Sequence, residues 1–456
     1  MKKISLFNLP YPFGKRQIYL PSTLIVVGAQ LIEAGFEVEL IDLNLNSLDE
    51  QWVQDKVRAA DFIGTSLVGS SNMPDAIQFS NQVYQVNPRA TILIGGQVTE
   101  GLLPNQFKTL FGDKPIQINN DSTLKKALGV NQLPDVFEID CVKMYKTISD
   151  EALKLYLEQE AGLFVAQGCR FACRFCGAAK SRQERFRSLE KIRTDLQYLA
   201  GKAREFGLSK LQFYISSLDL FQSPRLFADF LTIVGDVSEK TGVQIRIRGL
   251  SCISSFITAY KTLPNFHELV MKANLFAVGF GFDGTDEKVW RDENKTHNRL
   301  SLGDRVLEIC REVGITAELL MVFGFPEDNL RTLAKTVWYS VRKSFFCGAV
   351  ARPYLAKMFI PKNDNWMSVN FAAPVEKTVR HPSFFYNLDF AALGSPLTHP
   401  RRWHRWASNL AYLTIIILLT PFGKNTTFPL LPQGGKRPRW RQKLIEWINR
   451  KMPFDR

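Results

Sequence analysis

Short apolar runs alternate with longer amphipathic segments along the first 140 residues. Four of these runs have the length and composition of buried strands: residues 4–9, 38–42, 62–67 and 90–96. A helix is predicted between the first two runs, beginning at Ser22 and ending at Gly35. Regular alternation of strands and helices is typical of a parallel, doubly wound sheet. Residues 1–140 are therefore predicted to form a Rossmann-like α/β domain.

The alternation resumes over residues 155–360. Five more apolar runs are predicted strands: residues 163–166, 211–215, 243–248, 275–283 and 316–323. The helix expected at 301–313 places Val306 and Ile309 on one apolar face. Five or six such units predict a partial parallel (βα)6 barrel, and parallel barrels carry their active sites at the carboxyl ends of the strands.

Three cysteines follow the first barrel strand at the spacing C-x3-C-x2-C: Cys169, Cys173 and Cys176. Thiolates are the protein ligands of iron–sulfur clusters, most of which take four of them. The neighbouring cysteines in sequence are Cys141 and Cys252, so no fourth cysteine lies near the motif along the chain. Three ligands would leave one iron of a four-iron cluster open for a ligand. The alternatives are a structural zinc site or three buried cysteines that bind no metal.

The cysteine spacing, with Phe175 directly before the last cysteine, resembles the signature of the radical S-adenosylmethionine (SAM) superfamily. The resemblance implies a four-iron four-sulfur cluster whose open iron is chelated by SAM. It also implies that an electron from the cluster cleaves SAM to a 5'-deoxyadenosyl radical. A donor such as flavodoxin or ferredoxin would supply that electron, and a small molecule or lipid would be the substrate.

The same resemblance implies further SAM-binding residues, and Phe175 is one of them. Ser216, Ser217 and Asp219 occupy the place of the segment that binds the SAM amino group, although the usual Gly-Gly-Glu is absent. One of Arg246 and Arg248, expected at the end of their strand, could bind the SAM carboxylate, and the other is expected on the opposite face.

Two more positions complete the predicted barrel site. Gly281 and Asp283 resemble the strand that contacts the ribose and methionine parts of SAM. His297 could serve acid–base chemistry because its ordinary pKa lies near neutrality, but a structural role is favoured.

The first domain resembles the cobalamin-binding domain that precedes the radical SAM domain in one subfamily. Ser66, Leu67, Gly95 and Gly96 lie at its predicted ligand-facing strand ends. The first histidine of the chain is His267, so no histidine of this domain can be an axial cobalt ligand. The alternative is a domain that binds nothing and only supports the barrel. A methylthiotransferase is disfavoured because the cysteine motif has only Cys141 before it.

The chain has 456 residues and a net charge of +14, and much of this charge lies in a basic, mainly helical C-terminal region predicted over residues 361–456. Residues 400–456 contain twelve Lys and Arg against Glu446 and Asp455. Their apolar run at 410–419 is shorter than the roughly 20 residues of a spanning helix. Its Trp- and Arg-rich flanks favour peripheral contact with an anionic membrane; nucleic acid, an unlikely partner, and an ordinary packed tail are the rivals.

These features predict a cytoplasmic radical SAM enzyme that could associate with a membrane, because seven cysteines without a disulfide-like pattern indicate a reducing compartment. The predicted reaction is cobalamin-assisted methylation or rearrangement of a lipophilic or secondary-metabolite substrate. Two alternatives remain: SAM-dependent radical chemistry without cobalamin, and a non-catalytic iron–sulfur redox protein.

Overall fold

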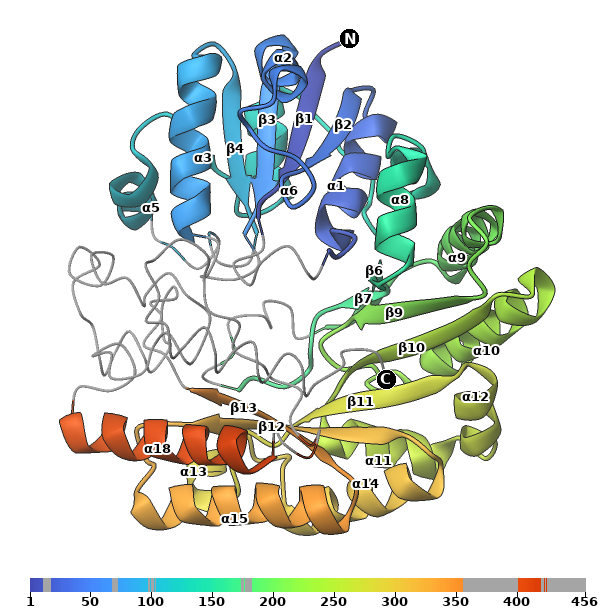
Figure 1. Cartoon of the computed structure of the whole chain (residues 1–456), viewed down its shortest axis with the longest axis vertical. Helices are drawn as coiled ribbons and strands as arrows, with labels where there is room; N and C mark the ends of the chain where they lie inside the picture. Colours follow the sequence, from blue (N-terminus) through green and yellow to red (C-terminus); the bar gives the residue numbers. More distant parts are fainter. Residues whose placement is uncertain are drawn as a thin grey trace.

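The computed structural model describes residues 1–10, 18–67, 73–96, 99, 102, 104–173, 176, 183–355, 401–419, 422 and 424. The chain forms two parallel sheets, each covered by helices (Figure 1). Of the helices in this described part, none is long and apolar enough to span a bilayer.

The first sheet is parallel, with the strand order β2-β1-β3-β4-β5. Its strands are β1 (Lys3–Asn8), β2 (Glu37–Asp42), β3 (Phe62–Ser66), β4 (Thr91–Gly95) and β5 (Ile116–Gln117). The order reverses between β1 and β3, and doubly wound sheets bind ligands at the carboxyl side of such a point. The prediction of a Rossmann-like domain is confirmed.

Helices cover both faces of this sheet. One face packs against α2 (Gln51–Ala59), α3 (Met73–Val86) and α5 (Pro104–Phe111), around Phe7 and Ile63. The other face packs against α1 (Ser22–Glu33), and its core continues without interruption into the barrel. The remaining helices before the barrel are α6 (Asp121–Leu128), α7 (Val142–Tyr145) and α8 (Asp150–Leu157).

The second sheet contains six parallel strands that lie side by side in chain order. They are β6 (Glu160–Phe164), β9 (Lys210–Ser216), β10 (Gln244–Ser251), β11 (Leu275–Gly281), β12 (Thr316–Phe323) and β13 (Val350–Leu355). The connecting helices are α9 (Leu189–Glu205), α10 (Pro224–Thr241), α11 (Ile253–Thr262), α12 (Phe266–Lys272), α13 (Glu287–Asp292), α14 (Leu300–Glu312) and α15 (Leu330–Phe346). This is the predicted partial (βα)6 barrel.

Specific hydrogen bonds join the two domains. The Tyr156 hydroxyl donates to the Asp42 carboxylate, and the Ile18 N–H donates to the Gln159 side-chain oxygen at 3.0 Å. The carboxyl ends of the strands in both sheets point toward the same central part of the molecule (Figure 1).

A last helix, α18 (Arg402–Leu419), packs beside α15 and against β13. His404 fixes it to the end of β12 through a hydrogen bond of 2.9 Å between Nε2 and the Phe325 carbonyl oxygen. The apolar run that the sequence places in a basic tail is therefore part of a helix that covers the edge of the barrel.

Candidate active site

The cysteine loop begins directly after β7 (Ala166–Gln167). This strand pairs in a short antiparallel ladder with β8 (Arg185–Phe186), which follows the cysteines in the chain. Arg170 anchors the loop to the segment after β9, because its backbone N–H donates to the Gln222 side-chain oxygen at 2.7 Å. The Arg170 guanidinium also donates to the Gln222 carbonyl oxygen at 2.6 Å. Cys176 turns back on Cys173 through a backbone hydrogen bond of 3.1 Å. Phe175 lies outside the described residues.

The three thiols differ in their surroundings. Cys169 is buried, and a hydrogen bond with the Cys252 thiol is the main cause that lowers the pKa of Cys169 to about 7. Burial raises the pKa of Cys173 to about 11, although Lys295 acts in the opposite direction. Cluster ligands must be thiolates, so a site that already stabilises one thiolate fits an iron–sulfur cluster.

Cys252 is distant from the cysteine motif along the chain but lies next to it in space. It directly follows β10 and reaches Cys169 across the carboxyl edge of the sheet. Its contact with Cys169 and its burial raise the pKa of Cys252, so it is a neutral donor to the Cys169 sulfur. Hydrogen bonds to ligand sulfurs tune cluster potentials. Among the residues the structure describes, which include the three cysteines of the motif, no three His, Cys, Asp or Glu side chains are grouped closely enough to hold one metal ion.

A buried ion pair between Lys295 and Asp283 lies beside the thiols, where β11 ends. Burial alone would lower the pKa of Lys295, but Asp283 and the neighbouring Cys173 and Cys252 raise it, so the ammonium stays charged. Gly281 makes room for this pair, because a Cβ at that position would lie 3.1 Å from Lys295 Nζ. No sequence signal points to Lys295, although it lies two residues before His297.

The segment around Lys295 also holds the cysteine loop in place. The Asn294 side-chain amide donates to the Ala172 carbonyl oxygen at 2.8 Å. The His297 ring stacks on Phe171 with centroids 3.7 Å apart. Burial lowers the pKa of His297 to about 3, with a further contribution from Lys295, so the ring is neutral near pH 7. This geometry supports the favoured structural role of His297.

The segment after β9 holds the end of β10 in place beside the site. The buried Asp219 carboxylate accepts hydrogen bonds from the Ser255 hydroxyl at 2.6 Å, and from the Ser251 hydroxyl and the Cys252 N–H at 3.0 Å each. Asp219 therefore positions Cys252 at the end of β10. Ser216 ends β9, and Ser217 follows it close to the same edge. The predicted SAM contacts of these three residues stay predictions.

Arg246 and Arg248 differ from their expected placement. Strand β10 continues to Ser251, so both arginines lie inside the strand rather than at its end. Side chains two residues apart in a strand share a face, so the expectation of opposite faces was wrong. The Arg246 guanidinium lies over the Phe276 ring, 4.3 Å from its centroid.

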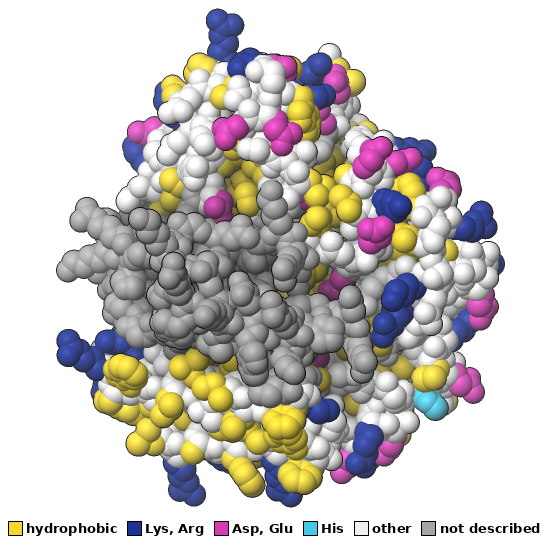
Figure 2. All heavy atoms as spheres, viewed as in Figure 1, with side chains coloured by type: hydrophobic (Ala, Val, Ile, Leu, Met, Phe, Trp, Pro, Cys, Tyr) yellow, Lys and Arg dark blue, Asp and Glu magenta, His cyan; other side chains and the backbone are white. Residues whose placement is uncertain are grey.

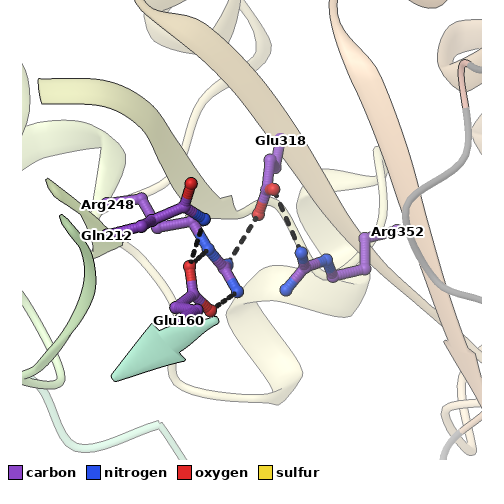
Figure 3. A network of polar contacts seen from close by, with 5 residues as sticks. All are labelled: Glu160, Gln212, Arg248, Glu318 and Arg352. Carbon is purple, nitrogen blue, oxygen red and sulfur yellow. Dashed lines mark hydrogen bonds and ion pairs between the residues drawn. The ribbon is translucent and has the colours of Figure 1, made fainter. Parts of the chain in front are cut away.

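Arg248 belongs to a network of polar and charged side chains from five strands inside the barrel (Figure 3). Its guanidinium binds both carboxylate oxygens of Glu160 and approaches Glu318 at 3.9 Å. Glu318 in turn accepts from Arg352 at 3.0 Å, and Gln212 donates to Glu160 at 2.9 Å. In the described contacts, Arg248 therefore joins Glu160 and Glu318 inside the barrel.

Replacement of Arg248 by methionine should lower the free energy of unfolding by about 3 kcal/mol, because it leaves two buried carboxylates with reduced compensation. Arg246→Met, on the same face of the same strand but without an ion pair among the described residues, should cost less than about 1 kcal/mol. Denaturant unfolding of the two variants compares them directly. Equal losses would show that the network does not stabilise the barrel.

In the first domain, the predicted loop residues meet at the carboxyl ends of β3 and β4. The Leu67 N–H donates to the Gly95 carbonyl oxygen at 2.8 Å. Gly96 has a φ of +100° and lies so close that a Cβ there would come 2.5 Å from the Leu67 carbonyl oxygen. The buried Ser66 hydroxyl has no hydrogen-bond partner among the described atoms. An unsatisfied hydroxyl at this edge fits a bound polar ligand.

The Gly96→Ala variant should weaken cobalamin binding at least about tenfold while cluster content stays unchanged, because the methyl group would separate the two loops. Gly112→Ala is the matched control: it also has a positive φ, +76°, but no atom lies within 4 Å of its Cβ position. Absorbance titration with cobalamin measures both variants. Equal affinities would remove these loops from the binding site.

Comparisons with known families agree with this geometry. Residues 163–337 match the radical SAM superfamily, and residues 17–104 match the B12 binding domain. The chain therefore carries a radical SAM domain with a B12-binding domain before it. No curated protein matches the sequence.

Solved structures of two cobalamin-dependent radical SAM enzymes share the fold. The radical SAM methyltransferase TsrM from Kitasatospora setae, solved with cobalamin and a [4Fe-4S] cluster, is 14% identical over 93% of each chain, with a TM-score of 0.63. OxsB, solved with aqua-cobalamin, is 16% identical with a TM-score of 0.60, and the alignment covers 84% of this chain and 56% of OxsB.

The two domains confirm the predicted cofactors: a four-iron four-sulfur cluster, SAM and cobalamin. Cys169, Cys173 and Cys176 are the residues that would hold the cluster. Ser66 and the Gly95–Gly96 turn would face cobalamin. This radical SAM enzyme therefore carries both sites on strand ends directed toward one region.

Proposed function

We propose that this radical SAM enzyme uses cobalamin to methylate a carbon atom of a lipophilic small molecule. The observation that carries the proposal is the common direction of the two carboxyl edges, one with the three thiols and the other with Ser66 and Gly96 (Figure 1). When bound, the cluster with SAM supplies a carbon-centred radical and cobalamin supplies a methyl group.

The residues of the chain prepare the site in three ways. Lys295 keeps a buried positive charge beside Cys173 and Cys252, where a reduced cluster would add negative charge. Asp219 and Cys252 orient the Cys169 sulfur, and Asn294 with His297 fixes the loop between the cysteines. Radical formation consumes an electron, so the proposal includes an external donor such as flavodoxin or ferredoxin. The described cysteines are all free thiols, which supports a cytoplasmic location.

Products of SAM test the proposal and separate it from its rivals. The anaerobically reconstituted full chain, with dithionite, should convert SAM to both 5'-deoxyadenosine and S-adenosylhomocysteine. Omission of cobalamin should abolish S-adenosylhomocysteine alone. If 5'-deoxyadenosine forms but S-adenosylhomocysteine never does, the enzyme performs radical chemistry without cobalamin. If SAM stays intact under all conditions, the chain is a redox protein and the proposal is wrong.

A further inference from the structure

Helix α18 is apolar on two opposite sides. One side, with Tyr412 and Ile415, is buried against the barrel. The other exposes Trp406 and Ile417 to 74% and 66%, in line with the exposed Trp403 and Leu410. A surface helix of a globular domain normally buries its single apolar stripe. The second stripe of α18 therefore lacks a partner among the described residues.

Helix α15, which packs beside α18, exposes large aromatic side chains and buries mostly small ones. Its buried residues are Leu333 and four small hydroxyl residues: Thr332, Thr336, Ser340 and Ser344. Its outer side exposes Trp338 to 66% and Phe346 to 77%. Phe345 of the same helix contacts Phe422, which follows α18, with ring centroids 5.1 Å apart. The aromatic groups of the two helices thus form one surface.

This surface, the α15/α18 face, is defined here by Trp338, Phe346, Trp403, Trp406, Leu410 and Ile417. Figure 2 shows hydrophobic side chains gathered over α15 and α18, with Lys and Arg side chains near them. Exposed apolar patches of this kind mark sites that bind proteins or membranes.

The charges on the two helices are all of one sign. Neither α15 nor α18 contains Asp or Glu. The exposed side of α15 instead carries Arg331, Lys335 and Arg342 between its aromatic residues, and α18 begins with Arg402. Long basic side chains can keep their charge in water while their stems cover apolar surface. A second copy of this face would bring like charges together, which disfavours a symmetric dimer through it.

We propose that the α15/α18 face docks on the surface of a bilayer that contains anionic phospholipids. Tryptophan side chains at the level of the lipid headgroups, aliphatic groups below them and basic residues above them are the composition of interfacial helices. Each basic residue near such a surface contributes roughly 1 kcal/mol. Leu410 and Ile417 offer nothing for nucleobases to stack on, so nucleic acid fits this face less well. The inference does not depend on the proposed methylation.

Vesicle sedimentation tests the docking with the full, reconstituted chain. Wild-type protein should bind vesicles of phosphatidylcholine mixed with phosphatidylserine, and binding should weaken as salt increases. Trp338→Glu/Trp406→Glu should reduce the partition coefficient at least about tenfold, since it removes two anchors and adds negative charge. Both side chains are exposed, so the fold and the cluster content should not change.

Met271→Glu is the control, because Met271 is 61% exposed on α12, away from this face, and the substitution adds one negative charge against two in the double variant. It should bind like the wild type. The inference is wrong if wild-type protein ignores anionic vesicles, or if the double variant binds them as well as the control does. It is also wrong if binding is equal on vesicles of pure phosphatidylcholine, or if the double variant only converts a dimer to a monomer.

Discussion

Substitution of Cys173 by serine should remove the iron–sulfur cluster and SAM cleavage together. The three cysteines of the loop are the proposed protein ligands of the cluster, and loss of one would leave a second iron without protein sulfur. Iron content should fall from about four per chain toward zero after anaerobic reconstitution and gel filtration, and 5'-deoxyadenosine should no longer form.

Cys252→Ala is the informative control, because Cys252 touches Cys169 without belonging to the motif. As a neutral donor it should be dispensable for iron content, whereas removal of its hydrogen bond should change the cluster potential. Loss of iron in Cys252→Ala would instead make it a fourth ligand, and the open iron on which SAM cleavage depends would disappear. Cys347→Ser, at the end of α15, should behave like wild type.

Replacement of Lys295 by methionine should destabilise the barrel by about 3–5 kcal/mol, because the Asp283 carboxylate stays buried without its partner. Loss of a positive charge beside Cys173 should also make the cluster harder to reduce, which shifts its potential to a more negative value. Calorimetry should show a melting temperature lower by roughly 6–20 °C. A redox titration followed by electron paramagnetic resonance measures the potential.

The double variant Asp283→Asn/Lys295→Met separates the two effects. It removes both charges, so most of the lost stability should return. If it remains as unstable as Lys295→Met, the ion pair does not account for the loss. If the potential of Lys295→Met equals that of wild type, Lys295 does not act on the cluster.

Much of this architecture follows from local pattern. Apolar runs of strand length at regular intervals predicted both parallel sheets, and the spacing of Cys169, Cys173 and Cys176 predicted the cluster and its family. Ser66 and Gly96 were found because strand ends of a doubly wound sheet share one edge. Each of these signals lies within a few consecutive residues.

Contacts between distant strands could not be predicted in the same way. Cys252 follows Cys169 by 83 positions, and only the order of strands brings their sulfurs together. Arg248 has the chemistry expected of a residue that binds a carboxylate, and its partner among the described residues is the carboxylate of Glu160. Lys295 and Asp283 form an ion pair because the end of β11 and the segment after α13 lie side by side. Such pairings depend on register and depth in the barrel.

The exposed aromatic side of α15 could not be predicted from the sequence, because a helix of the barrel is expected to place its apolar residues inward. Trp338 and Phe346 are instead exposed to solvent. Only the structure shows that small hydroxyl residues lie on the buried side.

A count of iron and cobalt in the anaerobically reconstituted chain tests the central claim, that one polypeptide holds both cofactors on facing strand ends. The account predicts about four irons and about one cobalt per chain after gel filtration, with the absorbance of a cluster and of a corrin together. A colourless protein that retains one zinc, or a chain that keeps its iron but never retains cobalt, would contradict it.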